Sequence, residues 1–134
     1  MKTSNLALLF AALADRTRLR LLNLMNGREV CVCYFVAILR QSQPKVSRHL
    51  AYLRRAGVVA ARRDGKWMHY RIVVPRDSGA ARIFGETLAS LREDKEMRAD
   101  LGLLKRACCA PEKLVMPSAA PPPTAVDGLG RAVG

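Results

Sequence analysis

Two thiols, Cys31 and Cys33, lie one residue apart in the stretch EVCVCYFVAIL, which spans residues 29–39 and is otherwise mostly apolar. A free cysteine packs like a small hydrophobic side chain, so each thiol alone is compatible with a place in the core. The pair can also chelate an ion, because alternate side chains of an extended segment point to the same side. On a regular helix the two side chains lie about 200° apart and cannot do so. The spacing therefore leaves two interpretations, core packing or a chelating site on extended backbone.

The other two cysteines, Cys108 and Cys109, are adjacent, and the redox state of all four depends on the compartment. The chain begins MK and continues with apolar residues 6–14, which have the size of the apolar part of a signal peptide. However, the charged start of a signal peptide would here be a single lysine, and apolar residues at helical spacing continue past residue 14 to Met25. No run approaches the ~18 apolar residues that a membrane span needs. We therefore expect a cytoplasmic protein without membrane association, whose cysteines stay reduced.

Positive charge is concentrated in one part of the chain. Residues 40–76 hold ten Lys and Arg side chains against a single acidic one, Asp64, which is a net +9 of the chain's formal +12. A solvated basic face is the simplest interpretation, but it leaves the clustering unexplained. Self-repulsion of this kind usually persists where a polyanion offsets it. We therefore expect a nucleic acid as the partner, with an anionic membrane surface as the second candidate.

Apolar residues at helical spacing, together with capping residues, predict four helices in the first part of the chain. They span about residues 4–13, Asp15 to Asn26-Gly27, Tyr34 to Arg40, and Ser42 to Gly57. Pro44 is tolerated because it falls in the first turn of the fourth helix. The stretch EVCV before the third helix is expected to be briefly extended.

After Gly57 the apolar residues no longer recur at helical spacing. Residues 58–73 predict a β-hairpin, because two strand-like runs flank Asp64-Gly65, a dipeptide that suits a tight turn. A further helix is expected from about residue 79 to 106. From Pro117 onward the chain is rich in proline and glycine, and we expect it to be disordered.

Short helices joined by a tight turn and followed by a basic hairpin are the order of a winged helix-turn-helix, so we expect a mainly α fold with a small β-hairpin wing. In that fold a recognition helix presents polar side chains near its N-terminus to the major groove. The hairpin contacts flanking phosphates, which set position and affinity. The residues expected to contact DNA are Ser42, Gln43, Lys45, Ser47, Arg48 and His49 on the helix, and Arg62, Arg63 and Lys66 on the hairpin.

Four motifs occur in order, namely ALADRTRLRLLNLM, EVCVCYF, QSQPKVSRHLAYLRRAGVV and RRDGKWMHYRI. Over about residues 5–75 the chain resembles the ArsR/SmtB metal-responsive repressors, and among them the arsenic-responsive ArsR branch. The resemblance implies a homodimeric repressor of double-stranded operator DNA, with dimer contacts from residues 4–13 and 79–104. Together with the composition of the C-terminal part, it leads us to expect a DNA-binding and dimerisation domain of residues 1–106 and a flexible, cysteine-containing tail of residues 107–134. Such a dimer reads an imperfect palindrome with half-sites ~34 Å apart.

Cys-X-Cys is the motif that this resemblance associates with arsenite sensing. It implies As(III) as the inducer, with Sb(III) or trivalent methylated arsenicals as further ligands. These soft ions prefer thiolate sulfur and favour three sulfurs. The arsenic branch often has a third cysteine three residues after the second, where this chain has Val36. Cys108 and Cys109 either complete the site of Cys31 and Cys33, which we favour, or form a separate site, or are incidental.

Other functions stay open at this point. A redox-sensing repressor of the same fold would use the four cysteines, with thiol pKa values lowered by Arg28 and the basic face. A zinc or cadmium sensor is a weaker alternative, because zinc-sensing members carry Asp and His on the final helix and ARIFGETLASLRE has no His. An enzyme would pair a cysteine with His49 or His69, but no phosphate loop or nucleophile elbow accompanies them. A constitutive DNA binder without an inducer is the last alternative.

Overall fold

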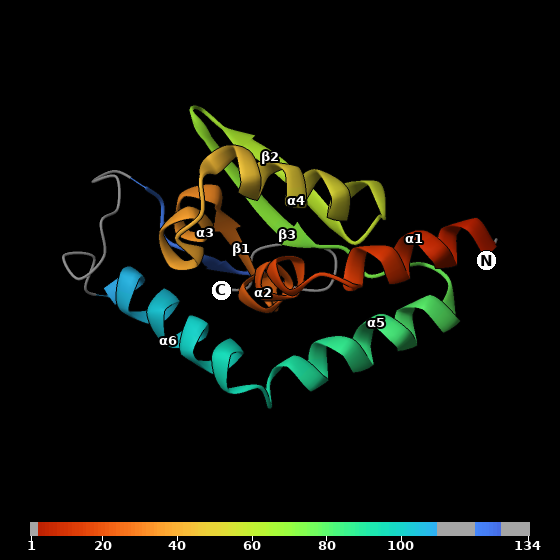
Figure 1. Cartoon of the computed structure of the whole chain (residues 1–134). Coiled ribbons are helices and arrows are strands. Elements are labelled where there is room, and N and C mark those ends of the chain that lie inside the picture. The colour runs from red at the N-terminus through yellow and green to blue at the C-terminus, as the bar shows by residue number, and fades with distance from the viewer. Residues whose placement is uncertain (1–2, 110–119, 127–134) are drawn as a thin grey trace.

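The computed structural model describes residues 3–109 and 120–126, and these form a mainly helical fold with a small antiparallel sheet (Figure 1). The elements in chain order are α1 (Thr3–Leu13), α2 (Arg16–Met25), β1 (Arg28–Cys31), α3 (Val32–Leu39), α4 (Gln43–Arg55), β2 (Val59–Asp64), β3 (Trp67–Ile72), α5 (Ser78–Leu91), α6 (Lys95–Cys109) and β4 (Thr124–Ala125). The predicted fold class, helices with a β-hairpin wing, is confirmed. Among the described residues, no helix is long and apolar enough to cross a membrane.

The predicted helix caps are confirmed at two positions. The Asp15 carboxylate accepts a hydrogen bond from the Arg18 backbone N–H at 3.0 Å and begins α2. The Ser42 hydroxyl accepts one from the Lys45 N–H at 3.4 Å and begins α4. Gly57 follows α4 with φ +81°, a conformation that glycine adopts without a steric penalty. The recognition helix therefore begins and ends close to where the sequence predicts.

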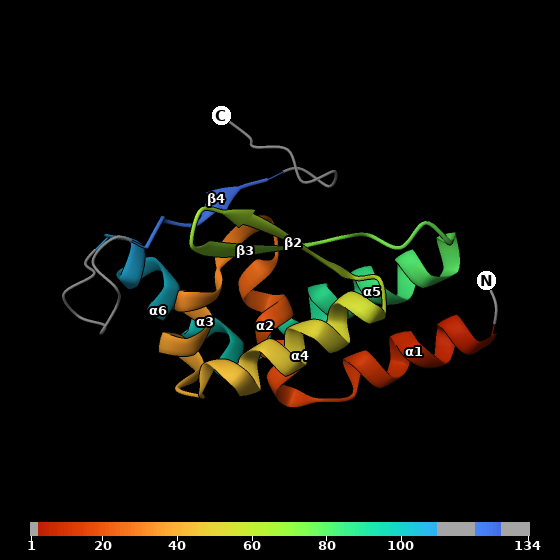
Figure 2. The ribbon, with the colours of Figure 1, turned by 90° about the horizontal axis from the view of Figure 1, so that it is seen from above.

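The sheet has the strand order β2-β3-β1-β4, and the hairpin of β2 and β3 projects as the wing (Figure 1). Figure 2 shows β2, β3 and β4 along one side of the helices. The wing turns at Asp64 and Gly65, as predicted, with Asp64 opposite Trp67 and Gly65 at φ +59°. Cys31 of β1 lies opposite His69 of β3. The strand that carries the first thiol, β1, is therefore paired directly with strand β3 of the wing.

The last part of the chain differs from the prediction. Instead of one helix over 79–106 there are two, α5 and α6, and the Asp94 carboxylate accepts the backbone N–H groups of Glu96 and Met97 to begin the second. Apolar residues at helical spacing lie on both sides of this break, which is why it was missed. Residues 120–126 were expected to be disordered, but β4 pairs antiparallel with β1. The division into domains at residue 106 stays a prediction, although α6 continues to Cys109.

Polar contacts hold α6 against α2. The Arg20 guanidinium donates two hydrogen bonds to the buried Asp100 carboxylate, at 2.8 and 3.0 Å. The buried Asn23 amide donates to the Met97 carbonyl oxygen at 2.9 Å. Farther along α6, Ala107 belongs to the same hydrophobic core as Cys31. The last helix therefore runs from an anchored start toward the region of the thiol pair.

Candidate thiol site and nucleic-acid interface

The thiol pair lies at the junction between a strand and a helix. Cys31 ends β1 and is the N-cap residue of α3, with extended backbone at φ −67° and ψ 141°. Cys33 lies in the first turn of α3. Cys31 is fully buried, Cys33 is partly exposed, and both thiols are free. The predicted extended backbone is present up to Cys31, but α3 begins at Val32 rather than at Tyr34, so Cys33 is helical and not extended.

The Cys31 thiol and burial both affect the ionisation of Cys33. Burial, followed by a hydrogen bond with the Cys31 thiol, raises the pKa of Cys33 to about 11. The expectation that Arg28 lowers thiol pKa values here is wrong for Cys33, and the Arg28 guanidinium instead donates to the Leu24 carbonyl oxygen at 3.0 Å. Cys33 is therefore protonated at neutral pH and is a poor nucleophile in the empty protein.

The described part of the chain supplies two sulfurs to this site and no more. It contains no group of three or more His, Cys, Asp or Glu side chains that is arranged to hold a metal ion. Cys108 and Cys109 end α6, but their side chains lie outside the described residues. Helix α6 packs against α3 of the same chain, so its end approaches the helix that begins at the thiol pair.

A buried histidine lies next to the first thiol. His69 faces Cys31 across the β1–β3 ladder, and directly opposed residues of an antiparallel pair project to the same side. The His69 side chain is 4% exposed, and its Nε2 has no hydrogen-bond partner among the described residues. Its nearest charged group is the Asp64 carboxylate, 4.0 Å away. The burial of His69 fits a structural role.

The recognition helix presents its predicted residues to solvent. Ser42, Gln43, Lys45 and Arg48 are exposed, whereas Ser47 and His49 are partly buried. On the opposite face of α4, Val46, Leu50 and Leu53 lie in the core.

His49 also contacts α2. Its Nδ1 lies 3.4 Å from a guanidinium nitrogen of Arg18 and 3.8 Å from the Asp15 carboxylate. The same Arg18 guanidinium lies 4.2 Å from the centre of the Tyr52 ring and donates to the Ala11 and Ala12 carbonyl oxygens. Arg18 therefore orients two side chains of the recognition helix.

A groove of about 640 Å³ separates the start of α2 from α4. Its lining residues are Thr17, Arg18, Gln41, Lys45, Arg48, His49 and Tyr52. The Gln41 amide donates to the Thr17 hydroxyl at 3.2 Å, which joins the two walls. Sequence reasoning missed Thr17, Gln41 and Tyr52, because only the folded chain brings α2 beside the recognition helix.

The wing divides the three predicted basic residues into two groups. Arg63 and Lys66 are exposed near the hairpin tip. Arg62 instead donates two hydrogen bonds to one carboxylate oxygen of Glu29, at 3.1 and 2.6 Å. Arg62 therefore has a protein partner on β1, which the sequence did not predict.

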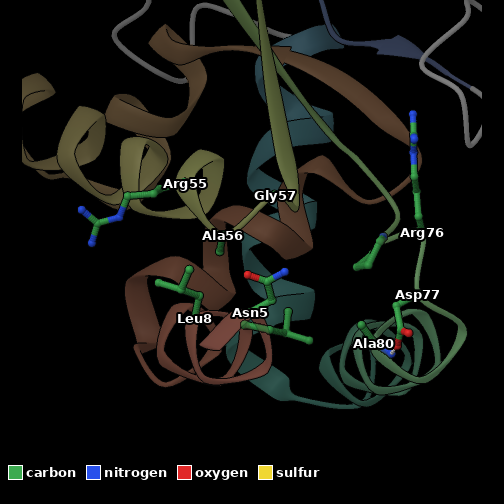
Figure 3. Close-up of a pocket in the computed structure, with 10 residues that line it drawn as sticks. Asn5, Leu8, Arg55, Ala56, Gly57, Arg76, Asp77 and Ala80 are labelled. Atoms are coloured by element: carbon green, nitrogen blue, oxygen red, sulfur yellow. Dashed lines mark hydrogen bonds between the residues drawn. The ribbon is translucent and has the colours of Figure 1, made fainter. Parts of the chain in front are cut away.

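A second cavity, of about 410 Å³, lies between α1, the end of α4 and the start of α5 (Figure 3). Leu8, Ala56 and Ala80 contribute apolar lining, and Arg55 and Arg76 extend from opposite sides of it. No cysteine or histidine lines this cavity. It is therefore separate from both the thiol pair and the groove beside the recognition helix.

Comparison with known proteins decides the family. Residues 15–61 match the model of the bacterial regulatory protein, arsR family. The arsenical resistance operon repressor of Escherichia coli is 42% identical over 103 residues, which cover 76% of this chain and 86% of that repressor. This chain belongs to the arsR family. The family resemblance inferred from its motifs is confirmed, and the chain is a DNA-binding transcriptional repressor of that family.

Two further ArsR-family proteins support the assignment. The arsenic resistance transcriptional regulator ArsR1 of Pseudomonas putida is 48% identical over 66 residues, which cover 48% of this chain and 52% of that regulator. The crystal structure of the AntR antimony-specific transcriptional repressor is 33% identical, with a TM-score of 0.52, over 67% of this chain and 79% of that one. Both are named as transcriptional regulators, and the structure of AntR matches the fold of this chain.

Proposed function

We propose that this protein is an arsenic(III)-responsive repressor, which binds its operator as a homodimer and dissociates when Cys31 and Cys33 bind trivalent arsenic or antimony. The observation that carries the proposal is the thiol pair at the start of α3, the helix that packs directly against the recognition helix α4. The names of its relatives, which include arsenical resistance repressors and an antimony-specific one, support the choice of ligand.

The ligand preference follows from the sulfur chemistry. Trivalent arsenic and antimony are soft and favour thiolates over carboxylates or imidazole. Two sulfurs suffice for a methylated trivalent arsenical, whereas inorganic As(III) favours three. We infer that Cys108 or Cys109 of the same chain supplies the third, and the packing of α6 against α3 supports this assignment.

Release follows from the geometry of the junction. To bind one ion, the Cys31 and Cys33 sulfurs must converge and lose their protons, which makes binding pH-dependent. Cys33 belongs to the first turn of α3, and the two positions diverge on a regular helix. Binding therefore favours unwinding of that turn. Because α3 and α4 share one core, a shift of α3 changes the direction of the recognition helix.

We expect operator binding to take place in the cytoplasm, where the DNA lies. It uses the basic face, which consists of the exposed Lys and Arg side chains of α4 and the wing. Lys45 and Arg48 on α4, with Arg63 and Lys66 on the wing, are the proposed contacts, and the groove beside Thr17 adds room for a DNA backbone. The proposed dimer contacts are α1 and the two helices that span residues 79–104, α5 and most of α6. Phe10 on α1 is a large apolar side chain that is 51% exposed, which supports burial by a second copy.

The test is the arsenite concentration that releases a fluorescent operator duplex, selected by the protein from a random pool. Cys33→Ser is expected to bind the duplex as wild type does, because the thiol is partly exposed, and to resist arsenite at concentrations at least about tenfold higher. Replacing Cys108 and Cys109 together by serine weakens release if they supply the third sulfur. Unchanged release would exclude that role.

Other results of the same assay favour the alternatives. Release by peroxide or polysulfide but not by arsenite would identify a redox sensor, which the raised pKa of Cys33 argues against. Release by zinc or cadmium but not by arsenite would identify a divalent metal sensor. An operator complex that no thiol ligand dissociates would identify a constitutive DNA binder.

A further inference from the structure

One face of the small sheet connects the thiol pair with the wing. His69 of β3 lies opposite both Cys31 of β1 and Arg62 of β2, so these three side chains project to the same face. Glu29 precedes Cys31 by two positions on the same strand and shares that face. The Arg62 guanidinium reaches across β3 to the Glu29 carboxylate, because β1 and β2 are not neighbours in the sheet.

The ion pair that spans this face is asymmetric in burial. The Glu29 side chain is 7% exposed, whereas the Arg62 side chain is 53% exposed. A buried carboxylate without a partner is strongly disfavoured, so Glu29 retains Arg62 when β1 moves. Arg62 belongs to the wing, and only Val30 separates Glu29 from Cys31. A displacement of the strand at the thiol pair is therefore transmitted to the hairpin.

We propose that Glu29 and Arg62 are positioning residues that couple the thiol site to the DNA-binding wing, so that ligand binding at Cys31 and Cys33 repositions the hairpin as well as the recognition helix. This inference rests on the proposed function, since it assigns the wing a part in release. Arg62, whose side chain is 53% exposed, stays a predicted phosphate contact and has this second role as the link to β1.

The wing carries its own reporter. Trp67 is the single tryptophan of the chain and begins β3, opposite Asp64 at the hairpin turn. Its emission can be followed in the full-length protein without DNA while arsenite is added. Bound arsenic per chain, measured by elemental analysis after gel filtration, reports ligand binding separately from wing movement.

The variants that break the link are Glu29→Gln and Arg62→Gln, and the matched control is Arg63→Gln, which removes the neighbouring exposed wing arginine. In wild type and in Arg63→Gln, saturation with arsenite shifts the Trp67 emission. In Glu29→Gln and Arg62→Gln the same amount of arsenic binds, but the shift is smaller, because only the β1–β3 pairing still connects the thiol site to the wing. The variant that combines Glu29→Gln with Arg62→Gln gives the same Trp67 shift as either single variant, because each of the three variants breaks the same ion pair.

A second readout measures the effect on the operator. The ratio of operator Kd values with and without arsenite falls about threefold in Glu29→Gln and in Arg62→Gln, and it stays above one because the route through α3 and α4 remains. It stays unchanged in Arg63→Gln, whose operator affinity falls equally in both forms. Arg62→Lys, which keeps the charge but not the two-bond geometry, gives an intermediate ratio.

The failures are distinguishable. If arsenite binds to wild type without changing Trp67 emission, or changes it equally in Glu29→Gln, the coupling role of the ion pair is overturned, whether or not DNA is released. If arsenite does not bind, the proposed function fails. In that case the Trp67 test uses mercuric ion, which also binds two thiolates. A Trp67 shift of the same size in wild type and in Glu29→Gln then overturns the inference.

Discussion

At the scale of single residues, the account depends on how the Cys33 sulfur is held. Burial and the neighbouring Cys31 thiol keep it protonated at neutral pH, since they raise its pKa to about 11. A protonated thiol reacts slowly with oxidants and alkylating agents. A soft ion that binds both sulfurs offsets the cost of deprotonation, whereas an oxidant that needs one free thiolate does not. The site therefore favours a chelated ligand over simple oxidation.

The raised pKa of Cys33 has a direct kinetic consequence. A thiol with a pKa of about 11 is ionised at pH 8 in roughly one molecule in a thousand, so alkylation by iodoacetamide is slow there. The rate is expected to rise about tenfold per pH unit up to pH 10. Mass spectrometry of the Cys33 peptide measures it, with unfolded protein as the control. A rate that levels off below pH 9 contradicts the environment described here.

Val36 provides a second residue-scale test, because it occupies the position where the arsenic branch often has a third thiol. Val36 is partly buried on α3, one turn after Cys33. Val36→Cys is expected to tighten arsenite binding at least about tenfold and to make Cys108 and Cys109 unnecessary for release. Titration of this variant with and without serine at those two positions measures the effect. A continued requirement for Cys108 or Cys109 would contradict the proposed ligand set.

At the scale of elements, the position of α6 decides whether its end can serve the thiol site. Asp100→Ala removes the carboxylate to which the Arg20 guanidinium donates its hydrogen bonds and leaves that partly buried cation without its main partner. We therefore expect the free energy of unfolding to fall by about 3 kcal/mol. Urea denaturation measures it. Glu96→Ala removes the carboxylate of the exposed Arg16–Glu96 ion pair and is expected to change stability much less. Equal losses in the two variants would contradict the role of Asp100 as an anchor.

The elements also show where prediction from sequence succeeds. Asp15 and Ser42 begin helices as expected, because capping depends on neighbours within three residues. Asp64-Gly65 forms the wing turn for the same local reason. The break before Asp94 was missed, because apolar residues at helical spacing occur on both sides of it, although the buried face changes direction between Leu91 and Met97.

The rest of the site depends on contacts between distant segments. The Glu29–Arg62 pair joins residues 33 positions apart and leaves no periodic signal in the sequence. The burial of His69 beside Cys31 likewise follows from strand register rather than from local sequence. The thiol pair itself was predictable, because two cysteines in an apolar stretch carry their chemistry in their spacing.

At the scale of the whole molecule, the basic face makes operator binding dependent on salt. The logarithm of the association constant is expected to fall linearly with the logarithm of salt concentration, with a slope of about −0.9 for each phosphate neutralised. Lys66→Gln, at the exposed wing tip, is expected to lower the magnitude of that slope by about 1. Fluorescence anisotropy across a salt series measures both. A slope near zero would contradict the assignment of this face to DNA.

The central claim is that the thiol pair cannot hold a trivalent metalloid while the recognition helix fits the duplex. The most direct measurement is the operator Kd of wild-type protein whose arsenic content has been shown to be saturating, compared with that of the empty protein under identical conditions. The account predicts that saturation raises this Kd at least about tenfold, by reciprocal linkage between the two sites. An arsenic-saturated protein that binds the operator as tightly as the empty one would contradict it.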